Sequence, residues 1–240
     1  MNYFPAFVLL LIFAIQSPMQ DLRPIYDARR SPESAKTPDA EVAILKRIIR
    51  PIDRKYWGKL SDNCDGEFEL IDVAQGAFTK PQSSQKAFLY RYCATGHNFA
   101  LNGIAVLEDG QIAAHLVYEG SWDNAVGALP DIDGDGLSEI LIATGGTNMG
   151  ETWGVISVIE LSEKGVSKFG ITETYSDNCG AVEKGKASAH RLQVRVGATP
   201  TFYRETFVSQ DCGKNGTWAK SEALKPIVMR KDEIKYQRLK

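Results

Sequence analysis

The sequence has almost no excess of charge of either sign. It contains 28 basic and 30 acidic residues among 240, which gives a net charge of -2. A chain with this balance has no overall electrostatic attraction to nucleic acid or to an anionic membrane. Its 43% hydrophobic, 24% charged and 10% aromatic residues exclude the disordered, collagen-like and coiled-coil classes. The length fits one domain, or at most two small ones.

The motifs of common enzyme classes are also missing. The three histidines, His97, His115 and His190, have no H-x-x-x-H or H-E-x-x-H spacing, and no G-x-S-x-G is present. The glycines of residues 145–150 are spaced like those of a P-loop, but Glu151 stands where the phosphate-binding lysine is needed. We therefore identify no catalytic residue and expect a protein that is not an enzyme. A secreted hydrolase, for example one that acts on glycans, stays open as the alternative.

The only long apolar run lies at the N-terminus. The first twenty residues carry no charge, and residues 4–15 are apolar apart from Pro5. This run is shorter than the ~20 residues that a membrane-spanning helix needs. Residues 1–20 therefore predict a secretory signal peptide, with an uncleaved anchor as the alternative. We expect a secreted, periplasmic or cell-surface protein with no stable membrane span after cleavage.

The four cysteines are Cys64, Cys93, Cys179 and Cys212. In an exported chain they predict two disulfides, and three pairings are possible. Their spacings are similar, and Ser-Asp-Asn-Cys occurs at both 61–64 and 176–179, which favours Cys64 with Cys93 and Cys179 with Cys212. A zinc site is disfavoured because the close C-x-x-C pairs are absent.

The chain divides into three further parts by composition. Residues 21–38 mix charges with three prolines and predict a linker. A helix follows, with Thr37 as its cap and Pro51 as its end. Its apolar stripe consists of Val42, Leu45, Ile48 and Ile49. We expect residues 39–230 to form a single β-rich domain and residues 231–240 a solvated charged tail.

From Glu67 onward, short runs rich in β-branched and aromatic residues alternate with glycine-bearing turns. This texture predicts a mostly β fold. The candidate strands are residues 68–78, 87–93, 103–107, 112–118, 139–143, 155–161, 168–174, 192–196 and 202–208. Glu108-Asp109-Gly110 predicts a tight hairpin, because Asp and Gly tolerate the positive φ of such turns.

One segment has the composition of a metal loop, residues 129–146, LPDIDGDGLSEILIATGG. Three aspartates alternate along it, Gly136 permits a sharp bend, and a glutamate follows. The candidate ligands are the side chains of Asp131, Asp133, Asp135 and Glu139 and the main-chain carbonyl of Leu137. Ca²⁺ takes six to eight oxygen ligands, which this spacing can supply. Two bare charges ~4 Å apart cost about 4 kcal/mol at ε near 20, so a cation or solvent must compensate them. The alternative is an acidic surface turn without metal.

The loop is not an EF-hand, because the twelfth position counted from Asp131 is Ile142 instead of glutamate. It resembles the calcium loop of FG-GAP repeats, which form the blades of integrin-type β-propellers, and of their VCBS-like relatives. Residues 143–146 match the small glycine-rich turn of that repeat, and residues 154–159 match its next strand. The resemblance covers residues 127–161, about one repeat.

The resemblance implies a propeller-like or partial-propeller arrangement of antiparallel sheets, preceded here by one N-terminal helix. It also implies that Ca²⁺ is bound by the five candidate ligands and stabilises the fold. Two departures stand out. Glu139 occupies the ninth position, where the family usually has Asp, and the chain has room for only three or four blades.

Four aromatic residues lie near predicted turns or strand ends and could stack on a sugar or a peptide: Tyr118, Trp122, Trp153 and Trp218. Aromatic caps of the core are the alternative. The sequence therefore predicts an exported, non-catalytic binding or structural module with calcium in one loop. Its expected partner is an extracellular protein or a glycan, and not nucleic acid.

Overall fold

The computed structural model describes residues 22–30, 39–58, 68–96, 99–162, 165–212 and 216–239. The larger of its two sheets contains β1 (Leu22–Asp27), β6 (Asp123–Ala128), β7 (Ile140–Asn148), β8 (Glu151–Ser162), β9 (Gly165–Asp177), β10 (Ala187–Arg195), β11 (Thr201–Ser209) and β12 (Ala219–Ile227). The smaller sheet contains β2 (Glu69–Gly76), β3 (Gln85–Gly96), β4 (Phe99–Glu108), β5 (Gln111–Gly120) and β13 (Gln237–Leu239). With the single described helix, α1 (Asp39–Trp57), they confirm a mostly β fold of antiparallel sheets.

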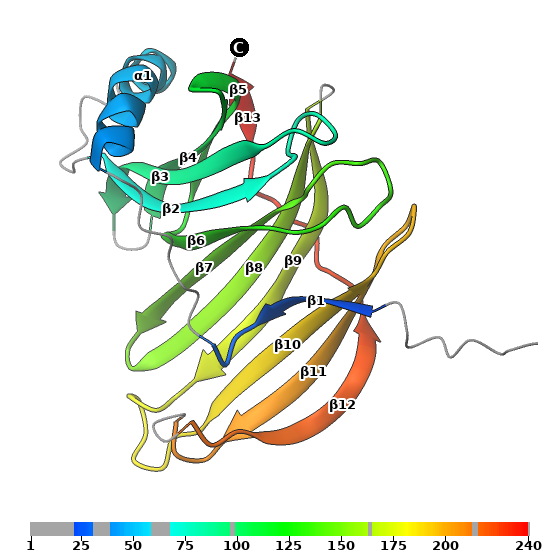
Figure 1. Cartoon of the computed structure of the whole chain (residues 1–240). Helices are drawn as coiled ribbons and strands as arrows, with labels where there is room; N and C mark the ends of the chain where they lie inside the picture. Colours follow the sequence, from blue (N-terminus) through cyan, green and yellow to red (C-terminus); the bar gives the residue numbers. More distant parts are fainter. Residues whose placement is uncertain are drawn as a thin grey trace, which may run out of the picture.

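The larger sheet forks between β9 and β10. These strands pair only where residues 187–189 face residues 175–177. Farther along β10, residues 191–195 pair with β1 instead. The fork separates a layer of β6–β9 from a layer of β1 and β10–β12, and apolar side chains of both layers form one core between them (Figure 1).

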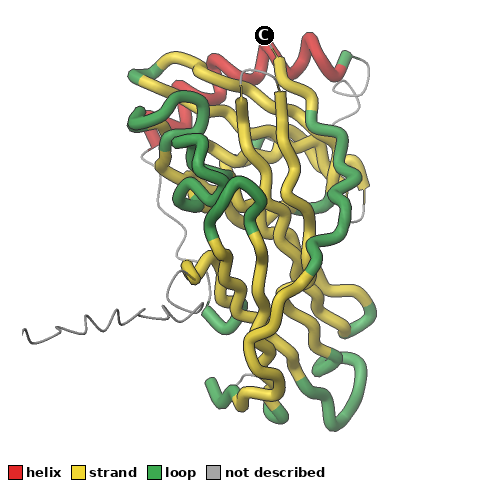
Figure 2. The backbone as a smooth tube through the Cα atoms, turned by 90° about the vertical axis from the view of Figure 1, so that its right-hand side faces the viewer, coloured by secondary structure: helices red, strands yellow, loops and turns green. Residues whose placement is uncertain are grey.

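The layer of β6–β9 is buried on both faces. In β7, Ile140 and Ile142 pack toward the smaller sheet, whereas Leu141 and Ala143 pack toward the layer of β10–β12. Because side chains alternate along a strand, burial of both faces requires an uninterrupted apolar run. Helix α1 covers the outer face of the smaller sheet through Leu45 and other side chains. The chain is therefore a stack of four layers, with α1 at one end (Figures 1 and 2).

Helix α1 does not end at Pro51, as the sequence predicted, but continues to Trp57. Proline removes one helical hydrogen bond, so another interaction must hold the last turns. Asp53, in these turns, fastens α1 to the smaller sheet: this fully buried carboxylate accepts a hydrogen bond from Tyr90 Oη at 2.6 Å and lies 3.1 Å from His115 Nε2. Thr37, the expected cap, lies outside the described residues.

All nine predicted strands are present, and so is the hairpin between β4 and β5. Its turn residues Asp109 and Gly110 have φ of 50° and 77°. Four strands escaped prediction: β1 and β13, within the expected linker and tail, and β6 and β12. The sequence of β12, AKSEALKPI, shows why, because its side chains are mostly exposed and only pairing with β11 defines it as a strand.

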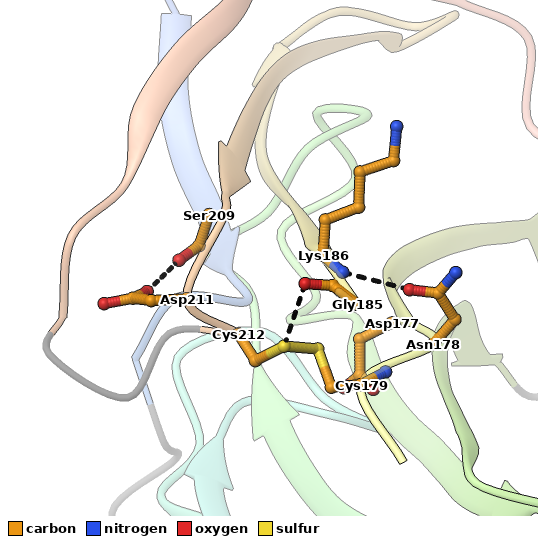
Figure 3. Close-up of a disulfide and its surroundings, with 8 residues drawn as sticks. All are labelled: Asp177, Asn178, Cys179, Gly185, Lys186, Ser209, Asp211 and Cys212. Carbon is orange, nitrogen blue, oxygen red and sulfur yellow. Dashed lines mark hydrogen bonds between the residues drawn. A yellow bond between two sulfur atoms is a disulfide. The ribbon is translucent and has the colours of Figure 1, made fainter. Parts of the chain in front are cut away.

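The predicted disulfide between Cys179 and Cys212 is present, with a Cα–Cα distance of 6.0 Å (Figure 3). It joins the β9–β10 connection to the segment after β11. Asp177 Oδ1 accepts a hydrogen bond from the Cys179 N–H at 3.1 Å. Cys93 is also disulfide-bonded, and Cys64, its expected partner, lies outside the described residues.

In the part of the chain that the structure describes, no helix has the length and apolar character to cross a membrane. The expected signal peptide, residues 1–20, lies outside that part.

Candidate metal centre

The acidic loop, residues 129–139, connects β6 to β7 in the doubly buried layer. The Leu129 N–H donates to the Glu139 carbonyl at 2.8 Å, which closes the loop at its base. Inside the loop, Ile132 is fully buried and Leu137 is 7% exposed. These two apolar side chains anchor the otherwise polar loop in the core.

Backbone hydrogen bonds hold the loop to the layers on both sides. The Ser138 N–H donates to the Ala77 carbonyl at 2.9 Å, and the Ala77 N–H donates to Ser138 Oγ at 3.1 Å, just after β2. On the other side, the Gly197 N–H of the β10–β11 turn donates to the Ile132 carbonyl at 3.0 Å. The loop therefore lies at a junction of three layers.

Main-chain N–H groups orient the aspartates of the loop. The carboxylate of Asp131 accepts hydrogen bonds from Gly134 N at 2.6 Å and from Gly136 N at 2.9 Å. Both glycines have left-handed φ, 94° and 90°, which this tight winding requires. Asp135 Oδ1 accepts from Leu137 N at 2.8 Å. A carboxylate has about four lone-pair sites, so these bonds leave acceptor capacity for a cation. The ligand role of the Leu137 carbonyl stays a prediction.

The acidic side chains converge in two groups. Asp131, Asp133 and Glu139 each offer one oxygen, and these oxygens all lie within 4.8 Å of one another. The same holds for Asp133, Asp135 and Glu160. The four predicted side-chain ligands are thus divided between the two groups, and Asp133 belongs to both. We call these five residues together the carboxylate cluster.

Glu160 was not predicted from the sequence. It lies on β8, outside the loop, and reaches the cluster because β8 pairs with β7 and places Ile159 opposite Ile140. One signal could have found it: Glu160 is the only charged residue in the apolar run 155–161. An acidic residue in a buried strand needs a partner.

Burial of Glu139 is complete, and only one of its oxygens is satisfied. Oε1 accepts a hydrogen bond from the Ile132 N–H at 3.2 Å, whereas Oε2 has no partner among the described residues. Burial, with the charges of Asp133 and Asp131, raises the pKa of Glu139 to about 8. The ionised form is therefore disfavoured unless a positive charge joins it.

Glu160 has the same character. Its side chain is 5% exposed, and its Oε2 has no hydrogen-bond partner in the described part of the chain. Burial, followed by the charges of Asp135 and Asp133, raises the pKa of Glu160 to about 7. No lysine or arginine in the described ranges forms an ion pair with any member of the carboxylate cluster. The cluster is thus an uncompensated concentration of negative charge.

The chain matches no protein-family model, and comparisons with the curated proteins and with the solved structures gave no match. The resemblance of residues 127–161 to FG-GAP repeats stays a prediction. The metal centre is supported by the geometry and burial of the carboxylate cluster.

The four predicted aromatic residues do not form one exposed face. Tyr118 is 1% exposed and donates a hydrogen bond to Asp123 Oδ2 at 2.6 Å, so it belongs to the core. Trp122 is 42% exposed, and the Arg91 guanidinium lies 4.8 Å from its ring. Trp153 and Trp218 are both half-buried and line a separate groove of about 430 Å³.

A larger groove, of about 980 Å³, lies between the end of α1 and the segment before β13. Tyr56, Trp57 and Arg230 contribute to its wall. Neither Glu139 nor Glu160 lines it. The carboxyl groups whose pKa burial raises most strongly are therefore separate from this groove.

Proposed function

We propose that the protein is an exported, non-catalytic structural or binding module whose fold is stabilised by Ca²⁺ in the acidic loop. The observation that carries the proposal is the buried Oε2 of Glu139, which has no protein partner and lies in a cluster with Asp131 and Asp133. A buried, uncompensated carboxylate costs several kcal/mol. A bound cation supplies the missing partner.

The donor set favours Ca²⁺ over transition metals. It contains oxygen donors and no histidine or cysteine, which suits a hard cation. The proposed ligands are the side chains of Asp131, Asp133, Asp135 and Glu139 and the Leu137 carbonyl, the last from the FG-GAP resemblance. Ca²⁺ accepts such a varied, partly flexible set more readily than Mg²⁺, which demands near-octahedral geometry.

The ion would act on stability, because its loop joins layers of the fold. The loop is bonded to Ala77 of the smaller sheet's connection and to Gly197 of the β10–β11 turn. Ordering the loop therefore secures contacts on both sides of the β6–β9 layer. Since ligand binding to the folded state alone adds to folding free energy, calcium strengthens this junction.

Export is supported by the apolar N-terminal segment and by the disulfide of Cys179 with Cys212, which is compatible with an oxidising compartment. The groove that Trp153 and Trp218 line is a place where an extracellular protein or a glycan could contact the module. Nucleic acid is disfavoured by the near-zero net charge.

The test is thermal unfolding of the purified chain in EDTA and in Ca²⁺. At 100 times the dissociation constant, a ligand adds about 2.7 kcal/mol, or roughly 5–10 °C for a chain of this size. Asp133→Ala should abolish the calcium shift, whereas Glu173→Ala, an exposed change on β9, should keep it. Equal melting temperatures of the wild type in EDTA and in Ca²⁺ would remove the metal from the proposal.

A secreted hydrolase is the second candidate, favoured by one observation. Glu139 and Glu160 have pKa values of about 8 and 7, in the range of a general acid. Their burial weighs against it, because side chains 0% and 5% exposed leave a sugar no approach. Turnover of a glycan panel by the wild type, lost in both Glu139→Gln and Glu160→Gln, would establish the hydrolase.

A further inference from the structure

We propose that the carboxylate cluster holds two adjacent Ca²⁺ ions, with Asp133 as the ligand that they share. Asp131 and Glu139 complete the acidic ligands of the first position, and Asp135 and Glu160 those of the second. This inference rests on the proposed calcium function and extends it by a second ion and by a ligand from outside the loop.

The geometry divides the cluster into two overlapping triads. In each triad the three ligand oxygens lie within 4.8 Å of one another, and Asp133 belongs to both. A carboxylate can serve two metal ions with its two oxygens, as in other two-metal sites. Asp133 keeps acceptor capacity for two ions, since the backbone hydrogen bond that it accepts is long, 3.3 Å from Asp135 N to Oδ1.

Glu160 supplies the independent observation for the second position. Its side chain leaves β8 on the same face as Val158, toward the layer of β10–β12, and not toward the smaller sheet with Ile159. It is 5% exposed, and its Oε2 has no hydrogen-bond partner among the residues described. The loop oxygens of Asp133 and Asp135 are its neighbours in the triad. A buried strand thus aims a carboxylate with one unpartnered oxygen at the loop.

Charge decides between one ion and two. The five carboxylates carry -5 when ionised, so one Ca²⁺ leaves -3 and two leave -1. Within the described ranges no basic side chain pairs with the cluster to reduce that excess. Two like charges ~4 Å apart repel by about 4 kcal/mol at ε near 20, so a residual -3 beside the buried Glu139 and Glu160 is unfavourable. The second ion removes most of this repulsion.

The test counts ions on the disulfide-intact chain. The protein is stripped with chelator, titrated with CaCl₂ at pH 8 by calorimetry, and weighed by native mass spectrometry. We expect two Ca²⁺ per wild-type chain and one in Glu160→Gln or Asp135→Asn. Asp135 is exposed, so its variant should fold even if the change at Glu160 is not tolerated. Glu139→Gln should also leave one, and the exposed control Glu173→Gln should keep two.

The outcomes separate this inference from the proposed function. One ion in the wild type overturns the second position and keeps the calcium module, whether or not Asp135→Asn removes that ion. Two ions that both persist in Glu160→Gln and Asp135→Asn place the second ion elsewhere and also overturn the inference. No ion in the wild type overturns both. Two ions reduced to one by each of Glu160→Gln and Asp135→Asn establish the shared site.

Discussion

Two of the regions that bury carboxylates differ in whether the protein supplies the hydrogen-bond partners. Asp123, at the start of β6, is 2% exposed and is the acceptor for Tyr118, Thr144 and Asn102. We call these four residues the Asp123 network. Glu139, at the end of the loop that follows β6, accepts a hydrogen bond from the Ile132 N–H and leaves one oxygen without a partner among the described residues. One carboxylate is satisfied by the chain, and the other is not.

The pKa values follow this difference. Burial raises the pKa of Asp123 to about 6, while the hydroxyl donors of Thr144 and Tyr118 oppose the rise. Burial raises the pKa of Glu139 to about 8, while the backbone N–H groups of Ile132 and Glu139 oppose the rise and the like charges of Asp133 and Asp131 add to it. The protein therefore satisfies the carboxylate of Asp123, whereas the carboxylate cluster keeps buried oxygens without a partner among the described residues, which a cation could fill.

The largest expected effect on the unfolding free energy comes from a substitution in the Asp123 network. Asp123→Ala removes the acceptor of three side chains and should cost about 3–5 kcal/mol of unfolding free energy, since each stranded buried donor costs about 1–3 kcal/mol. Urea unfolding in Ca²⁺ and in EDTA should give the same loss. A loss under about 1 kcal/mol, or one that depends on calcium, would contradict the contrast between the two regions.

The pH dependence of the unfolding free energy tests the same Asp123 network. Because the folded-state pKa of Asp123 lies above its ordinary value, the folded chain holds this proton more tightly than the unfolded chain. Its contribution is therefore greatest below about pH 4 and falls by about 3 kcal/mol as the pH rises through 6. The difference in unfolding free energy between wild type and Asp123→Asn should show this slope between pH 4 and 6 and be flat above pH 7. A flat difference throughout would show that Asp123 is not protonated in the fold.

The sequence predicted the loop better than its surroundings, for a physical reason. The ligands from Asp131 to Glu139 are close in sequence, so their spacing alone indicates a common centre. Glu160 joins them through the pairing of β7 with β8, and Asp53 meets Tyr90 and His115 through packing of α1 on the smaller sheet. Such contacts depend on tertiary structure, which no local pattern encodes.

The strands show the same division. The apolar run at the start of β7 allowed this strand to be predicted, because a strand that is buried on both faces has consecutive apolar residues instead of alternating apolar and polar ones. By contrast, β1 contains Pro24 and charged residues, and only the fork between β9 and β10 makes it a strand. Strands made of buried apolar residues can be predicted from residue propensity, whereas a strand such as β1 forms because it pairs with residues distant in the sequence.

A smaller effect on stability is expected at Glu139 of the carboxylate cluster, and its sign should differ between Ca²⁺ and EDTA. In Ca²⁺, Glu139→Gln should lower stability, because it removes a charged ligand. In EDTA at pH 8 the same variant should be about 1–3 kcal/mol more stable than the wild type, because a buried charge beside Asp133 and Asp131 is gone. Thermal unfolding of both proteins in both buffers measures this. Destabilisation in both buffers would mean that the protein itself satisfies Glu139.

The smallest effect is expected at an exposed, partnered carboxylate. Glu69, on β2, lies 2.7 Å from Arg91 through Oε2, and its side chain is 58% exposed. Water solvates such a group whether or not the pair forms, so Glu69→Gln should change the unfolding free energy by less than about 0.5 kcal/mol. Calcium should not alter this value, because Glu69 lies outside the carboxylate cluster. A change as large as that of Asp123→Ala would show that charge alone, and not burial with or without a partner, sets the cost of an acidic residue in this fold.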